Sequence, residues 1–203
     1  MQNKKNIDKI GNTLVYLTSK LGSIFLTKAI KLLYLLDEFS VRETGVPFTW
    51  LEYKAWKMGP VPVDMYSELR EKLPFEPESS LFSKFISVKR TGNPVQPEFD
   101  SFLLESSIPF NNDEFTEYDI DLMDRVLNKY GGYSATDLIN ILHSEGSLWD
   151  KVVKDNNLDF VFALMHNRSE HTIPFTDLIK EDEIKQLAYK AAFSTILFDC
   201  ELI

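Results

Sequence analysis

The chain has 203 residues, with 22 lysines and arginines against 31 aspartates and glutamates, which gives a formal net charge of -9 at pH 7. This length predicts one large domain, or one domain with an appendage, that buries roughly two-thirds of the surface of the unfolded chain. The acidic balance argues against non-specific binding to nucleic acid, because a phosphate backbone would be repelled.

The sequence holds a single cysteine, Cys200, so no disulfide can form within the chain. One unpaired thiol is typical of a reducing compartment, and a disulfide between two copies is the alternative that it leaves open. The first ten residues lack the apolar stretch of a signal peptide, and no window reaches the length of a membrane span. We therefore expect a cytoplasmic protein that makes no membrane contact.

Apolar residues at steps of three and four predict an amphipathic helix over residues 7–21. A second helix follows at once, and its apolar residues cover nearly every side. Lys31 is expected on the narrow side that faces solvent. Asp37 continues an apolar lane of this helix, and we expect it to be half-exposed in the last turns. The alternative is a buried carboxylate that has found its own hydrogen-bond donor.

The segment FTWLEYKAW, residues 48–56, alternates between two sets of apolar side chains. This alternation predicts a strand, with a helix as the alternative. Gly59 and Pro60 form the predicted corner after the strand, since glycine adopts torsions that other residues resist. Pro62 has the fixed φ of a first helical turn and Asp64 favours the positive end of the helix dipole, so the next helix should begin at Pro62.

Residues 82–99 alternate enough to predict a short hairpin around Gly92 and Asn93. Residues 178–199 predict a terminal helix. Its expected inward positions are Ile184, Leu187, Ala191 and Ile196. The complete pattern predicts an α+β fold that is predominantly α-helical, with a helical core and a small antiparallel sheet or hairpin.

Two pairs of residues have the spacing of capping boxes. Thr116 with Asp119, and Ser134 with Asp137, each place a hydroxyl three residues before a carboxylate. These pairs predict the starts of two helices, of which the first ends at the glycine pair 131–132.

Motifs of catalytic chemistry are absent from the sequence, which has no P-loop, dinucleotide fingerprint, G-x-S-x-G, H-E-x-x-H or paired C-x-x-C. His166 and His171 are five residues apart, a spacing that does not place two zinc ligands on one helical face. His143 ends a predicted helix, with Glu145 and Trp149 close by, so a general base is one hypothesis. We favour the alternative, a histidine that caps its helix and packs on an aromatic neighbour. We therefore expect no cofactor and no metal.

Four aromatic residues surround the predicted corner in the sequence: Tyr34, Tyr53, Trp56 and Tyr66. A core cluster is the default interpretation, because aromatic side chains bury large areas. Aromatic residues also anchor protein interfaces, so any exposed member of the group is a candidate for partner binding.

The run LTKAIKLLYLLDEFSVRETGVPFTWLEYKAWKMGPVPVDMYSELR and the later run FTEYDIDLMDRVLNKYGGYSATDLINILHSEGSLW contain four short motifs: K-L-L-Y-L, aromatic-x-x-G-P-V, S-A-x-x-L and H-x-E-x-x-x-W. The motif residues are Lys31, Leu32, Leu33, Tyr34, Leu35, Trp56, Gly59, Pro60, Val61, Ser134, Ala135, Leu138, His143, Glu145 and Trp149. In their order and number they resemble the Panacea domain, also called the SocA-like antitoxin domain, a phage-associated family.

The resemblance implies a mostly helical, non-enzymatic bacterial module that neutralises the toxin encoded by a neighbouring gene through direct binding. Some relatives act as adaptors that deliver the bound toxin to a protease, so a cognate toxin and a protease are the implied partners. The family pairs one scaffold with unrelated toxins, so the identity of the toxin is not implied, and the oligomeric state stays open.

The resemblance also implies a Panacea domain over residues 1–155, followed by a C-terminal extension over residues 156–203 whose terminal helix packs on the same domain. Two other functions stay open. One is a small hydrolase that uses His143 with a carboxylate such as Glu145 or Asp150, and the other is a phage-associated structural protein.

Overall fold

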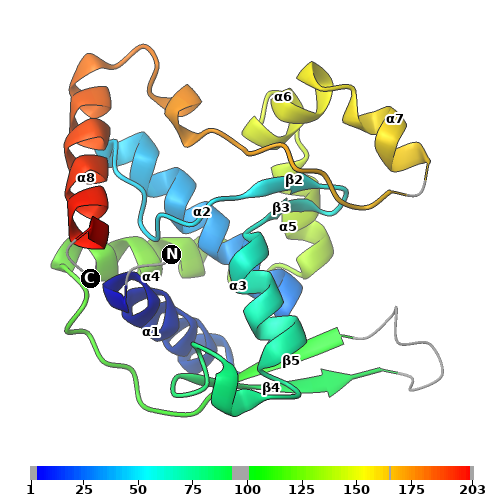
Figure 1. Cartoon of the computed structure of the whole chain (residues 1–203), viewed down its shortest axis with the longest axis vertical. Coiled ribbons are helices and arrows are strands. Elements are labelled where there is room, and N and C mark those ends of the chain that lie inside the picture. The colour runs from blue at the N-terminus through cyan, green and yellow to red at the C-terminus, as the bar shows by residue number, and fades with distance from the viewer. Residues whose placement is uncertain (1–3, 93–100, 165, 202–203) are drawn as a thin grey trace.

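The computed structural model describes residues 4–92, 101–164 and 166–201 (Figure 1). The α-helices are α1 (Lys4–Leu21), α2 (Leu26–Thr44), α3 (Val63–Ser67), α4 (Glu117–Tyr130), α5 (Ala135–Leu142), α6 (Leu148–Asp155), α7 (Leu158–Ala163) and α8 (Glu183–Glu201). Shorter helical turns are the π-helix η1 (Glu68–Lys72) and the 3-10 helices η2 (Pro77–Ser79) and η4 (Phe175–Leu178). The strands are β1 (Ile24–Phe25), β2 (Lys54–Trp56), β3 (Gly59–Val61), β4 (Ile86–Thr91) and β5 (Ser101–Ser106). The fold is α+β and predominantly helical, as predicted.

Helix α2 lies at the centre of the molecule (Figure 1). It contacts α4, α5 and α8, the hairpin strand β3, and strands β1 and β5 of the sheet. The consecutive residues Leu32, Leu33, Tyr34 and Leu35 point in four directions around the helix, and each is at most 3 % exposed. The prediction that this helix is buried nearly all round is confirmed. Any charged side chain on it must therefore find its partner inside the protein.

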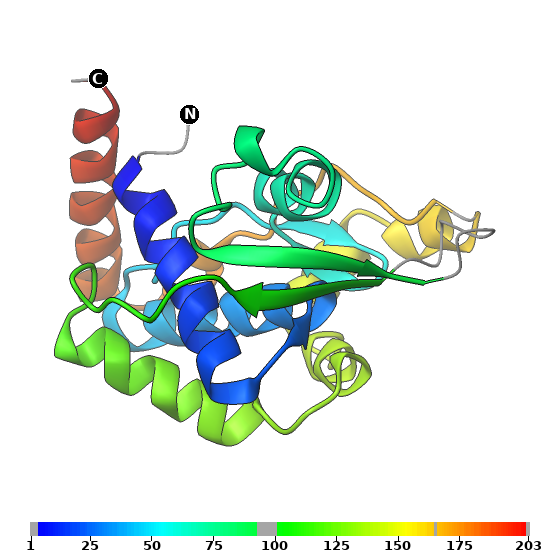
Figure 2. The same cartoon turned by 90° about the horizontal axis from the view of Figure 1, so that it is seen from below.

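The larger sheet has the antiparallel order β1-β5-β4, and it packs against α1 and α2. Figure 2 shows the two long strands β4 and β5 side by side, crossing α1. Strands β4 and β5 do pair antiparallel, but Thr91 pairs with Ser101, so the second strand lies beyond the predicted range 82–99 and the predicted short turn at Gly92 and Asn93 is wrong. Gly92 follows β4 directly, whereas Asn93 lies outside the described residues.

The predicted strand over residues 48–56 is wrong for most of its length, because only its last three residues form β2. Thr49 bonds to a side chain and not to a neighbouring strand, although Tyr53, next to β2, accepts from the N–H of Ile173 over 2.8 Å. The backbone N–H of Thr49 donates to Asp37 over 2.6 Å, and Trp50 has a positive φ of 57°. A segment held in this way cannot form a ladder, however well its side chains alternate.

The predicted corner at Gly59 and Pro60 is also wrong, because both residues belong to strand β3. Trp56 pairs with Gly59, so the chain reverses at Lys57 and Met58 in a two-residue hairpin turn. The helix after the hairpin begins one residue later than predicted, at Val63.

The other edge of β2 is covered by residues 167–173. Ala55 N–H donates to the His171 carbonyl over 2.9 Å, and Lys57 N–H donates to the Asn167 carbonyl over 3.0 Å. Residues 167–173 therefore satisfy the outer backbone edge of β2 and hold the hairpin in place from that side.

Both predicted capping boxes are confirmed. The hydroxyl of Thr116 accepts from the N–H of Asp119, whose carboxylate accepts in return from the N–H of Thr116. Ser134 and Asp137 form the same reciprocal pair at the start of α5. Gly131 is the C-cap of α4, so the glycine pair ends that helix as predicted.

Helix α8 is present, but its predicted inward face is wrong. Ile184 and Leu187 are 80 % and 66 % exposed. The inward face instead places Tyr189 and Phe193 against the ring of Trp50, with centroid distances of 5.1 and 5.8 Å. Apolar residues occur on several sides of α8, so the position of Trp50 selects the side that packs against the rest of the protein, where Phe193 is still 43 % exposed. Among the described residues, no helix combines the length and apolar character of a membrane span.

Asp37 is completely buried in the middle of α2, so the half-exposed position expected for it is wrong. Its carboxylate accepts from the N–H and the hydroxyl of Thr49 and, over 2.8 Å, from the hydroxyl of Tyr53. Burial raises the pKa of the Asp37 carboxyl to about 6, although these hydrogen bonds act in the opposite direction. Asp37 thus attaches the segment after α2 to the centre of the protein.

We expect Asp37→Asn to change how stability depends on pH. The pKa of Asp37 is higher in the folded protein than in the unfolded chain, so this carboxyl stabilises the fold below about pH 4, and the contribution is lost as pH rises to about 6. Urea unfolding should therefore show Asp37→Asn gaining up to about 3 kcal/mol relative to the wild type across this interval. A stability difference between the two proteins that is independent of pH would contradict a raised pKa at Asp37.

Candidate functional site

Lys31 is completely buried in α2, and its expected position on a solvent-facing side is wrong. Strand β3 covers this side of the helix, and the Lys31 ammonium group donates to the Pro60 carbonyl over 2.7 Å. Burial lowers the pKa of the Lys31 side chain to about 7, because the charged form loses its hydration. The backbone of the hairpin thus compensates a buried cation.

Gly59 passes directly over the Lys31 ammonium group with a positive φ of 92°. A Cβ atom at this position would lie 3.1 Å from Lys31 Nζ and 3.4 Å from His143 Nε2. Two features require glycine at position 59: the positive φ of its backbone, and the close approach of β3 to the side chains of Lys31 and His143.

His143 lies at the end of α5, and its ring stacks on Trp149 with a centroid distance of 3.6 Å and an interplanar angle of 5°. Packing on an aromatic neighbour is therefore confirmed. Burial, together with the nearby charge of Lys31, lowers the pKa of His143 to about 4. The imidazole is neutral at neutral pH, so the favourable effect expected from a protonated histidine at a helix end is not obtained.

Trp149 connects this stack to the hairpin, because its indole N–H donates to the Trp56 carbonyl over 2.9 Å. Lys31, the Gly59–Val61 strand, His143 and Trp149 therefore meet at one place, although they come from distant parts of the sequence. We call this cluster the hairpin anchor.

The two carboxylates proposed as partners of His143 lie elsewhere. Asp150 accepts from Gly146 N–H over 2.8 Å and from the Lys154 ammonium group over 2.9 Å, and Glu145 is exposed. His143 Nε2 is buried without a hydrogen-bond partner in the part of the chain that the structure describes. No acid–base pair is assembled there among the described residues.

His166 and His171 are both exposed in the segment after α7, and the side chain of Cys200 lies outside the described residues. Within the described ranges, no group of histidine, cysteine, aspartate or glutamate residues could hold a metal ion.

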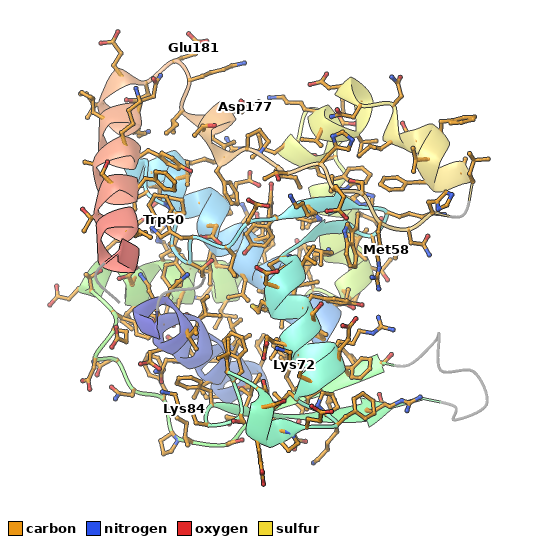
Figure 3. The ribbon with its side chains drawn as sticks, in the orientation of Figure 1. Trp50, Met58, Lys72, Lys84, Asp177 and Glu181 are labelled. Atoms are coloured by element: carbon orange, nitrogen blue, oxygen red, sulfur yellow. The ribbon has the colours of Figure 1, made fainter. Side chains whose placement is uncertain are left out.

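A cavity of about 610 Å³ opens beside the hairpin anchor. Its walls are Thr27, Ile30, Lys31, Trp56, Lys57, Met58, Val61, Tyr66, Arg70, Asn167 and Arg168. Figure 3 places Met58 at the tip of the hairpin, far from Trp50 beside α8. This volume is within the range of small-molecule sites in proteins.

Residues 30–150 match the antitoxin SocA-like, Panacea domain family. The match covers more than half of the chain, and it includes every residue of the hairpin anchor. The chain belongs to the SocA-like, Panacea domain family. No curated protein and no solved structure matches it.

Within this Panacea domain, most of the four aromatic residues proposed for partner binding are core residues. Tyr34 and Tyr53 are buried to 1 % and 0 % exposure, and they pack edge to face with a centroid distance of 5.1 Å. Both are inaccessible to a partner, because α2 and the segment after it close around them. Trp56 is 9 % exposed, and only Tyr66 is partly exposed.

The residues of the hairpin anchor are recognisable in the sequence as family motifs, but their meeting at one place is not. The cavity also escapes prediction from the sequence, because Lys57, Arg70 and Arg168 lie in three separate segments. In the sequence each of these cations has acidic residues close by, so no local excess of positive charge marks the cavity. Only the fold shows that these residues converge.

We expect Gly59→Val to lower the free energy of unfolding by about 1–3 kcal/mol, because valine resists the positive φ and its side chain would displace Lys31 and His143. Thermal and urea unfolding would measure the loss. Gly132→Val is the matched control, since no atom lies within 4 Å of a Cβ built at Gly132. Equal stability of the two variants would show that β3 tolerates a side chain above Lys31.

Proposed function

We propose that this protein is an antitoxin-like binding module that neutralises the toxin encoded by a neighbouring gene through direct contact. The observation that carries the proposal is the match of residues 30–150 to the SocA-like antitoxin family. Delivery of the bound toxin to a protease is a second form of the same proposal, and it requires the same contact.

The hairpin anchor supports a role in presenting a surface. Lys31 and Trp149 are buried and bind the backbone of β3 and β2, so they hold the hairpin in a fixed position. A surface that is already rigid loses less conformational entropy when a partner binds. In this proposal, Lys31 and Trp149 contribute to partner binding by holding the hairpin rigid, without contacting the partner themselves.

The tip of this hairpin carries Met58, which is 56 % exposed and lies within the part of the chain that matches the family. Tyr66 is the accessible aromatic residue beside it. A flexible thioether adapts to partner surfaces of different shapes, and tyrosine supplies contact area at a low entropic cost. We propose these two side chains as the centre of the toxin contact.

Net charge indicates what kind of partner is suitable. With a charge of -9, the module should associate fastest with a basic protein, because complementary charge accelerates encounter more than it sets the final affinity. We propose that the cognate toxin is more basic than this protein.

The hydrolase alternative has less support, because it requires a carboxylate on His143. Of the two carboxylates closest in the sequence, Asp150 is bound to Gly146 and Lys154, and Glu145 is exposed. A neutral imidazole without such a partner is a weak general base.

We expect the neighbouring gene to stop growth when it is expressed alone and to be harmless when this protein is expressed with it. Met58→Ser should weaken the rescue and reduce binding in a pull-down, because it removes an exposed apolar contact without touching the core. Leu81→Ser, a change at a residue that is 46 % exposed before β4, is the matched control and should rescue fully.

Toxin levels during rescue separate the two forms of the proposal. A stable toxin indicates direct inhibition, whereas a shortened half-life that depends on a protease indicates an adaptor. A neighbour that is harmless in every host, together with a pull-down that recovers no other protein, would falsify the antitoxin proposal.

A further inference from the structure

The cavity beside the hairpin anchor is lined by four basic side chains from four parts of the fold. Lys31 comes from α2, Lys57 from the hairpin turn, Arg70 from η1, and Arg168 from the segment after α7. No carboxylate is among the described residues that form its walls. In a chain with more acidic than basic residues, this local excess of positive charge is unexpected.

These four cations contact neutral groups only, as far as the described residues show. The Lys57 ammonium group donates to the Phe162 carbonyl over 3.2 Å, and the Arg168 guanidinium lies 4.6 Å from the Trp56 ring centroid. Arg70 donates to the Tyr66 hydroxyl.

Cations nearby but outside the cavity are neutralised in the usual way. Lys72, two residues after Arg70, pairs with Glu68, and Lys54, on the strand that leads to Lys57, pairs with Glu52 over 2.7 Å. The lack of counter-charges is thus a property of the cavity itself, which focuses a positive potential inside a concave wall.

A second observation points to a ligand. The indole N–H of Trp56, whose side chain lines the cavity and is only 9 % exposed, has no hydrogen-bond partner among the described residues. Buried N–H groups without an acceptor are rare in native proteins. A residue of the cavity wall thus carries a buried donor without an acceptor, in addition to the unpaired charges of the wall.

We propose that this cavity binds a small molecule that carries phosphate groups. A single carboxylate would neutralise only one of Lys57, Arg70 and Arg168, whereas a di- or triphosphate carries several negative charges in a small volume. The planar guanidinium groups of Arg70 and Arg168 suit bidentate contacts with phosphate oxygens. Trp56 and Tyr66 provide an aromatic wall for an attached base or other flat group.

The shape and the charge of the protein argue for a small ligand. The cavity of about 610 Å³ is large enough for one small molecule, and the acidic remainder of the surface would repel a long polyanion such as nucleic acid. This proposal does not rest on toxin binding, although Met58 and Tyr66 also line the cavity, and its test uses the purified chain alone.

The test is isothermal titration of the full chain with inorganic triphosphate, ATP and adenosine. We expect triphosphate and ATP to bind, adenosine not to bind without its phosphates, and ATP to bind more tightly than triphosphate because the aromatic wall holds the base. Arg168→Gln should weaken ATP binding about tenfold, as expected for the loss of one charge-assisted contact. No hydrogen bond between described residues depends on the Arg168 side chain, so this variant should fold normally.

Lys151→Gln, which removes the same charge from the exposed side of α6, is the control and should bind ATP like the wild type. The proposal is overturned if neither triphosphate nor ATP binds at concentrations up to about 1 mM. It is overturned equally if Arg168→Gln and Lys151→Gln bind alike, or if an acidic peptide binds while both phosphate compounds do not.

Discussion

The burial of α2 on nearly every side forces the protein to compensate two charged groups in its interior. Asp37 is compensated by Thr49 and Tyr53, and Lys31 by the carbonyl of Pro60. Each solution brings a later segment of the chain onto the helix, first the irregular stretch before β2 and then the β2–β3 hairpin. The positions of this stretch and of the hairpin, and therefore of the cavity beside the hairpin, depend on these two compensations.

The residues of the family motifs act together to hold the β2–β3 hairpin against α2. Lys31 needs a carbonyl above it, Gly59 lets the backbone come close enough to supply one, and the stacked pair of His143 and Trp149 supports the same hairpin from α5 and α6. Burial lowers the pKa of both Lys31 and His143, and the nearby charge of Lys31 lowers the pKa of His143 further.

The surface and the recess of the molecule have opposite electrostatic character. The chain is acidic as a whole, which suits a basic protein partner, yet the cavity beside the hairpin concentrates unpaired cations. Met58 and Tyr66, proposed for the toxin contact, also line this cavity, so a protein and a small anion would contact the same side chains. One rigid hairpin can thus serve both proposed sites.

Interactions between near neighbours in the chain were predictable from the sequence. The capping boxes at Thr116 and Ser134 and the mostly helical fold follow from local hydrogen bonds and periodicity, whereas the partner strand of β4 lies outside the predicted hairpin. Tertiary structure alone decided the burial of Lys31, the inward face of α8 beside Trp50, and the convergence of Arg168 with the other cations of the cavity. The physical reason is that burial and charge compensation depend on which distant segment covers a side chain, and periodicity contains no information about that partner.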